Sequence, residues 1–67
     1  SSQYKEAISD FSKAIQLDPN YTKAYYNRGV AKLKSGDKTG ACMDLRMASS
    51  LDSNDLDIYM ALSKNCE

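Results

Sequence analysis

The sequence predicts an all-α fold, an antiparallel helix-turn-helix solenoid of four helices. The main observation is an internal repeat: AISDFSKAIQLDPN, residues 7–20, is echoed by ACMDLRMASSLDSN, residues 41–54. The offset of 34 residues is a period typical of helix-turn-helix solenoid repeats. Within each copy, apolar residues recur at i, i+4 and i+7, which is the spacing of one helix face. The sequence shows no strand-like alternation and no long linker.

The two copies predict the first and third helices, over about residues 4–17 and 38–51. Small residues flank a large one on each apolar face, which lets two helices approach closely while the large side chain fills the gap. Pro19 disfavours a helical conformation of the residue before it, so the first helix should end at LDPN. The apolar faces consist of Ala7, Phe11, Ala14 and Leu17 in the first copy and Ala41, Leu45, Ala48 and Leu51 in the second.

The second helix is predicted over about residues 23–35, between the two copies. Thr22 is a plausible N-cap, because its hydroxyl can accept from a free N–H of the first turn. Gly36 is free to take the left-handed conformation that often ends a helix. Asp37 can then cap the third helix.

The fourth helix is predicted over about residues 55–66, beginning at Ser53 or Asp55. Its expected apolar stripe at i, i+3 and i+7 is Tyr59, Leu62 and Cys66.

The two cysteines, Cys42 and Cys66, are predicted to be small buried apolar residues. A disulfide between them stays open, because the sequence does not give their distance. They lack CxxC spacing and the chain has no histidine, which excludes zinc fingers and thiol–imidazole pairs.

Composition narrows the functional classes. A chain of 67 residues forms at most one small domain, too small for a deep catalytic cavity. Nine basic and nine acidic side chains cancel, which disfavours binding to nucleic acid. No apolar run approaches the roughly 20 residues of a membrane span. Without histidine, a phosphate loop or a base beside either cysteine, we expect no enzyme and no cofactor or metal.

A set of small and large residues makes the chain resemble the tetratricopeptide repeat (TPR) family, whose unit is a helix–turn–helix. The residues that carry the resemblance are Tyr25, Gly29, Ala41, Leu45 and Ala48. The resemblance implies one TPR-like domain over residues 1–67, in which 1–21 is the second helix of a preceding repeat, 22–55 a complete repeat and 56–67 the first helix of a following repeat.

Four residues depart from the family's pattern. Arg28 stands where the family usually has Leu, and Ser53 stands where it has Pro. Lys32 and Cys66 stand where it usually has an aromatic residue. These departures leave local packing and the rigidity of the last turn open, while the repeat assignment holds.

The resemblance also implies a concave surface that commonly receives an extended peptide or a partner helix. A stripe along the second helix offers two cations, an amide and an apolar strip, which suit an extended, acidic or carboxylate-bearing segment. The alternative is an ordinary solvated helix face. The predicted peptide-binding residues are Lys23, Tyr26, Asn27, Val30 and Lys34 on the second helix and Asp57, Met60, Ala61 and Lys64 on the last.

Some co-chaperone members of the family hold a partner's C-terminal carboxylate with side chains from two repeats. Lys23 and Asn27 match the first half of that clamp, whereas Asp57 and Ala61 replace the Lys and Arg of the second. We therefore expect a protein–protein interaction module with a different ligand. The alternative is an architectural segment of a longer solenoid, without its own ligand, that self-associates through its terminal helices. Its outer faces would be those around Ile8, Phe11, Ile58 and Leu62.

Overall fold

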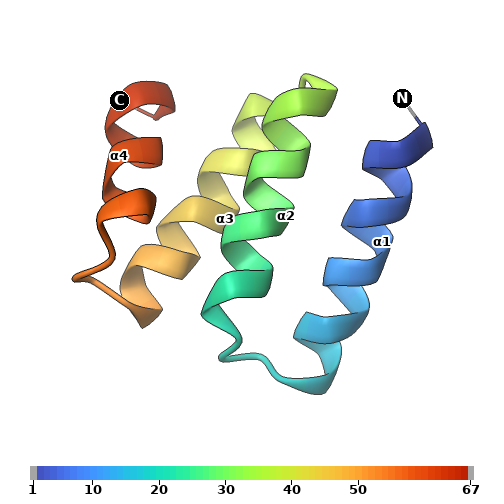
Figure 1. Ribbon diagram of the computed structural model, residues 1–67, viewed down its shortest axis with the longest axis horizontal. Coiled ribbons are helices and arrows are strands. Elements are labelled where there is room, and N and C mark those ends of the chain that lie inside the picture. Colours follow the sequence, from blue (N-terminus) through green and yellow to red (C-terminus); the bar gives the residue numbers. More distant parts are fainter. Residues whose placement is uncertain (1, 67) are drawn as a thin grey trace.

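The computed structural model describes residues 2–66, which form four α-helices. They are α1 (Ser2–Leu17), α2 (Thr22–Ser35), α3 (Lys38–Leu51) and α4 (Leu56–Asn65). Figure 1 shows them in chain order, and each helix packs on the next one along the chain. The predicted all-α solenoid is confirmed, with helix ends within two residues of those predicted. Within residues 2–66, no helix is long and apolar enough to cross a membrane.

Pro19 organises the turn between α1 and α2. The Tyr25 hydroxyl donates to the Pro19 carbonyl oxygen at 3.0 Å, which ties α2 to the turn. The predicted N-cap at Thr22 is wrong: the N-cap is Tyr21, which makes no side-chain capping bond. The Tyr21 N–H donates to the Asp18 carbonyl oxygen at 3.1 Å, so the chain has already turned when it reaches Thr22.

The other predicted caps are confirmed. Gly36 has a φ of 97°, the left-handed conformation, at the end of α2. The Asp37 carboxylate accepts from the Gly40 N–H at 2.9 Å and caps α3. Asp55, the later of the two predicted starts, caps α4 by accepting from the Ile58 N–H at 3.1 Å. Local sequence signals therefore set these three helix ends.

Replacing Gly36 with alanine is expected to lower the free energy of unfolding by about 1 kcal/mol, since a Cβ is disfavoured in the left-handed region. No atom lies within 4 Å of the added Cβ, so the cost should come from the backbone alone. Urea unfolding followed by circular dichroism measures it. Gly36→Asn should lose less, because asparagine tolerates this conformation. Equal stability of Gly36→Ala and the parent would contradict the assignment.

The core lies mainly between α2 and α3. Leu45 on α3 is 0% exposed and faces Gly29 on α2. A Cβ at Gly29 would lie 3.1 Å from Leu45 Cγ and 3.2 Å from the Ala41 carbonyl oxygen, so any larger residue would require these neighbours to shift by a few tenths of an ångström. All five residues that carry the family resemblance are buried. The buried residues within the described chain are Ala24, Tyr25, Gly29, Ala31, Ala41, Cys42, Asp44, Leu45, Ala48 and Ile58.

Two predicted core positions are wrong. On α4 the buried side chain is Ile58, at 2% exposed, whereas Tyr59 is 64% exposed. Ile58 packs with Tyr25 and Ala48, so the buried face of α4 is rotated by one residue from the predicted stripe. Leu17, at the end of α1, is 89% exposed and does not extend the apolar face of its helix.

Cys42 and Cys66 form a disulfide, with an S–S distance of 2.06 Å and Cα atoms 5.7 Å apart. The prediction of two separate buried apolar residues is therefore wrong, and the alternative left open by the sequence is the observed one. Cys42 lies in the first half of α3, and Cys66 follows the last residue of α4. The disulfide forms because α4 turns back along α3 and brings its C-terminal end to that point.

Candidate peptide-binding groove

A groove runs between α2 and α4 and consists of two adjoining hollows that share Tyr26 and Asp57. The first hollow, of about 290 Å³, lies at the start of both helices. The second, of about 550 Å³, continues toward their C-terminal ends. We call this surface the α2/α4 groove. Its lining residues are Thr22, Lys23, Tyr26, Asn27, Val30 and Leu33 from α2, Asp55 before α4, and Asp57, Ile58, Tyr59, Met60, Ala61, Ser63, Lys64 and Asn65 from α4.

The packing order of the helices creates this groove. α3 lies between α2 and α4 in Figure 1 and packs on both, so that α2 and α4 flank it. Tyr26 and Leu62 pack against the buried cluster of Tyr25, Ala48 and Ile58, which fixes both walls to the core. The rigid core thus sets the spacing of the groove.

The structure brings eight of the nine predicted peptide-binding residues into the groove, and Lys34 is the exception. At the repeat offset of 34 residues, Asn65, the last residue of α4, corresponds to Ala31 on α2. Lys34 therefore lies beyond the end of the opposite wall. The eight are Lys23, Tyr26, Asn27, Val30, Asp57, Met60, Ala61 and Lys64, and their role in binding stays a prediction.

Sequence reasoning missed part of the lining. The sequence places Tyr59 in the core stripe, whereas the structure buries Ile58. Because one residue along a helix turns a side chain by about 100°, Tyr59 lies in the groove lining instead. The predicted stripe contains Lys34 and not its neighbour Leu33, but the residue that lines the groove is Leu33. Thr22 was predicted only as a helix cap and Asp55 only as a possible start of the last helix, and both also line the first hollow.

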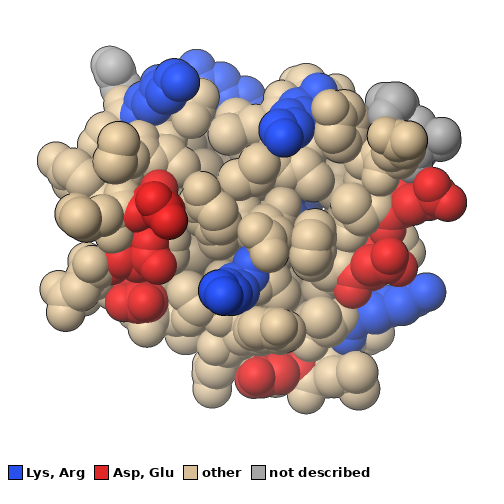
Figure 2. All heavy atoms as spheres, in the orientation of Figure 1, with Lys and Arg blue, Asp and Glu red and all other residues tan. Residues whose placement is uncertain are grey.

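Opposite charges face each other at the start of the groove. Figure 2 shows an acidic cluster over the first turns of α4 and a basic group over the first turns of α2. Lys23, Asp55 and Asp57 line that hollow, and Lys64 lines the second one. The charges of the lining residues therefore balance, so the predicted preference for an acidic partner stays a prediction without support from the groove.

The apolar part of the groove is open to solvent. Met60 is 63% exposed, and Tyr59 beside it is also exposed. Val30 and Leu33 line the same hollow from the α2 side and are half-buried. The second hollow thus presents apolar side chains from both walls, which an apolar side chain of a ligand would cover.

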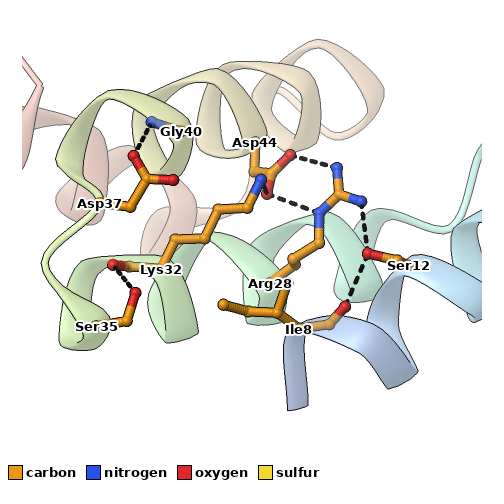
Figure 3. A network of polar contacts seen from close by, with 8 residues as sticks. All are labelled: Ile8, Ser12, Arg28, Lys32, Ser35, Asp37, Gly40 and Asp44. Carbon is orange, nitrogen blue, oxygen red and sulfur yellow. Dashed lines mark hydrogen bonds and ion pairs between the residues drawn. The ribbon is translucent and has the colours of Figure 1, made fainter. Parts of the chain in front are cut away.

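A buried ion cluster behind the groove fastens α2 to its neighbours (Figure 3). Arg28 Nε and Nη2 donate to the two Asp44 oxygens at 2.8 and 2.7 Å, and Lys32 Nζ lies 3.0 Å from Asp44 Oδ2. Arg28 Nη1 also donates to Ser12 Oγ of α1 at 3.1 Å. The hydroxyl of Ser12 in turn donates to the Ile8 carbonyl oxygen. Three helices are thereby joined through Arg28, which binds Asp44 of α3 and Ser12 of α1.

The protonation of Asp44 follows from this geometry. Burial alone would raise the pKa of its carboxyl group, but hydrogen bonds from Arg28 and Lys32 and their positive charges outweigh burial, and the pKa is lowered. The hydrogen bond to Asp44 likewise raises the pKa of Arg28. The sequence indicated this cluster only indirectly, through two cations one helical turn apart where the family has apolar residues.

The predicted self-association surface is not one continuous face. Ile58 is buried in the core, and Leu62 beside it is half-buried against the same cluster. Ile8 and Phe11 lie on α1, at the other end of the helix row in Figure 1, and are half-buried. The part of this surface expected at Ile58 is therefore wrong, while self-association itself stays a prediction.

The described residues offer no metal site. Across residues 2–66, no group of three or more histidine, cysteine, aspartate or glutamate side chains is arranged to hold an ion.

Comparison with known proteins supports the repeat architecture. A family model described as "TPR repeat" matches residues 1–36, and one described as "Tetratricopeptide repeat" matches residues 22–55. The chain is 36% identical over 64 residues to "Serine/threonine-protein phosphatase T" of Aspergillus oryzae, covering 96% of this chain and 13% of that protein. It is 43% identical over 47 residues to "DnaJ homolog subfamily C member 7 homolog" of Dictyostelium discoideum, covering 70% of this chain and 9% of that protein.

A third relative is "RNA polymerase II-associated protein 3" of Xenopus tropicalis, 40% identical over 62 residues, which covers 92% of this chain and 9% of that protein. The chain thus spans less than a fifth of the length of these relatives, whose names describe the whole proteins. The segment they share with this chain is the repeat itself. With two family models that each match more than half of its residues, this chain belongs to the tetratricopeptide repeat family.

Proposed function

We propose that the α2/α4 groove binds an extended peptide segment or a helix of a partner protein. Tetratricopeptide repeats are a non-catalytic fold for protein–protein interaction, and this chain is such a module. The observation that carries the proposal is the groove itself, in which apolar side chains from two helices line one hollow and polar side chains line the next. A ligand could be oriented by the polar end and held by the apolar one.

The length of the groove suits a short extended segment. Lys23 and Leu33 are ten residues apart on α2, or about 15 Å at a rise of ~1.5 Å per residue. An extended peptide rises about 3.3 Å per residue, so about five residues would fill the groove. Alternate side chains of such a segment point the same way, so two or three would face Tyr26, Val30 and Met60.

Asn27 is placed to hold the backbone of that segment. It is exposed on α2 and lines the first hollow. An amide side chain both donates and accepts, so it can pair with the N–H and C=O of an extended chain whatever its sequence. Lys23 and Asp57 nearby offer one charge of each sign for the ends or flanks of the ligand.

The combined substitution of Asn27→Ala and Met60→Ala is expected to weaken peptide binding roughly tenfold or more, because each truncation removes a contact worth about 1 kcal/mol. The probes are three peptides of about seven residues that share a core of alternating leucine and threonine and are flanked by aspartate, asparagine or lysine. Fluorescence anisotropy gives the affinity, and amide chemical shifts locate the bound peptide. Both substituted side chains are exposed, so the fold should be retained.

Lys34→Ala is the matched control, since Lys34 lies on the same helix as Asn27 and outside the groove. It should leave the affinity unchanged for all three peptides. If the double variant binds as tightly as the parent, the groove is not the binding site. If the aspartate-flanked peptide binds best and Lys34→Ala weakens its binding, the ligand lies along the stripe of α2 that includes Lys23 and Lys34, and not in the groove.

A further inference from the structure

α4 is the wall of the groove that the rest of the chain holds least. α2 packs on both α1 and α3, whereas α4 packs mainly on α3 and reaches α2 through the contact of Ile58 with Tyr25. Among the described residues of α4, Ile58 is the buried one. Leu62, one turn later, is half-buried against the core cluster. A helix with so small a buried face depends on any further attachment to stay in place.

The disulfide is that attachment. Ile58 anchors the first turn of α4 in the core, and Cys66 anchors the other end to Cys42 on α3. Apart from Asp57, which precedes Ile58, the α4 residues that line the apolar hollow lie between these two anchors. They are Tyr59, Met60, Ala61, Ser63, Lys64 and Asn65. The position of this wall is therefore set at its C-terminal end by a covalent bond.

The disulfide borders a surface hollow, and we expect a small thiol to approach it at Cys66, which is half-buried, because Cys42 is only 6% exposed. A hollow of about 530 Å³ on the surface is lined by both Cys42 and Cys66. Lys38, Arg46 and Lys64 also line it. Their positive charges favour the thiolate that leaves when another thiolate attacks the disulfide, which assists exchange at this site.

We propose that the redox state of the Cys42–Cys66 disulfide controls ligand binding in the α2/α4 groove, a regulation that rests on the proposed function. One thiolate of a dithiol reductant attacks one sulfur and forms a mixed disulfide. The second thiol of the reductant then attacks the reductant's own sulfur in that bond, which closes a ring and releases the second cysteine of the protein. The disulfide gains two electrons and two protons and becomes two thiols, while the dithiol becomes a cyclic disulfide. The C-terminal part of α4 then leaves α3, and the apolar hollow loses one wall.

The loss of affinity follows from the fraction of molecules in which α4 is in place. A ligand that needs both walls binds only that fraction, so its apparent dissociation constant rises in inverse proportion. If reduction leaves α4 docked in about a tenth of the molecules, binding weakens roughly tenfold. α1, α2 and α3 keep their buried contacts and should remain folded.

The test compares the oxidised chain, the chain in the dithiol dithiothreitol, and the double variant Cys42→Ser with Cys66→Ser. Each is titrated with whichever of the three flanked peptides binds the oxidised chain most tightly. Amide hydrogen exchange is recorded on the same samples without peptide. Reduction should weaken binding roughly tenfold and speed exchange in α4 from Tyr59 onward, with protection kept in α2 and α3. The double variant should match the reduced chain and ignore dithiothreitol.

The outcomes separate this inference from the proposed function. Equal affinity before and after reduction would overturn the inference and leave the groove assignment intact. If no peptide binds even the oxidised chain, the proposed function and the regulation both fall. Loss of protection in α2 and α3 on reduction would also overturn the inference, because the disulfide would then support the whole fold and not α4 alone.

Discussion

Replacing Leu45 with alanine is expected to lower the free energy of unfolding by about 3 kcal/mol. Leu45 is 0% exposed at the contact of α2 and α3, so truncation removes buried apolar surface and leaves a cavity. Leucine-to-alanine changes in protein cores cost about 2–5 kcal/mol, depending on how far the site can collapse. Because a chain of this length has a stability of only a few kcal/mol, the variant should be largely unfolded at room temperature. Urea unfolding at low temperature, followed by circular dichroism, measures the loss.

Leu17→Ala is the matched control, because it makes the same chemical change where the side chain is 89% exposed. It should alter stability by less than about 0.5 kcal/mol. Leu45→Val, with an expected loss of about 1 kcal/mol, keeps the measurement possible if the alanine variant does not fold. Equal losses at the two leucines would mean that Leu45 does not fill the core.

Gly29 offers a second check on the same contact. A methyl group there would point at Leu45 Cγ, 3.1 Å away, and in the parent it should be destabilising. The Leu45→Ala change removes the leucine contacts and leaves only the Ala41 carbonyl oxygen, 3.2 Å away, so Gly29→Ala should be better tolerated in that background. A double-mutant cycle would then give a coupling free energy of about 0.5 kcal/mol or more. Additive effects would place the two residues out of contact.

The sequence was sufficient for the helices because their ends depend on neighbouring residues. Pro19, Gly36, Asp37 and Asp55 act through the backbone within a few positions, and a pattern shows such effects directly. The groove was also largely predictable, since two helices 34 residues apart must repeat the same orientation on a shared core. Lys34 shows the limit of that reasoning, because the wall opposite it ends at Asn65.

Features that join distant parts of the chain were harder to predict. Asp44 meets Arg28 and Lys32 across two helices, and nothing in the residues next to Asp44 indicates those partners. The disulfide likewise depends on a distance between residues that are 24 positions apart. Ile58 and Tyr59 are both apolar enough for a core, and only the angle at which α4 meets α3 decides between them. These features belong to packing, which a single sequence does not specify locally.

Replacing Asp44 with alanine is expected to cost about 3 kcal/mol of folding stability. The change removes the carboxylate and leaves Arg28 and Lys32 without it in positions that are only about a fifth exposed. Breaking a buried pair from one side is costly, because the remaining charge has lost both its partner and most of its water. The partial exposure of the two cations places the value at the lower end of the usual range of about 3–5 kcal/mol.

Asp10→Ala is the matched control for this change, because Asp10 occupies the equivalent place in the first copy of the repeat and is exposed. It should alter stability by less than about 0.5 kcal/mol. Thermal unfolding at neutral pH compares the two variants with the parent. A loss at Asp10 as large as that at Asp44 would show that charge in general, and not the buried cluster, stabilises the chain.

The pH dependence gives the sharper form of the prediction. The pKa of Asp44 is lower in the folded chain than its unfolded value of about 3.9, so the folded carboxylate holds its proton less tightly. Its contribution is therefore complete above about pH 4 and is lost as the pH falls through that value toward the lowered pKa. The stability of the parent should decline in acid by an amount that Asp44→Ala does not share, so the difference between them should narrow from pH 7 to pH 3. A difference that stays constant across this range would mean that Asp44 stabilises the fold by packing rather than by its charge.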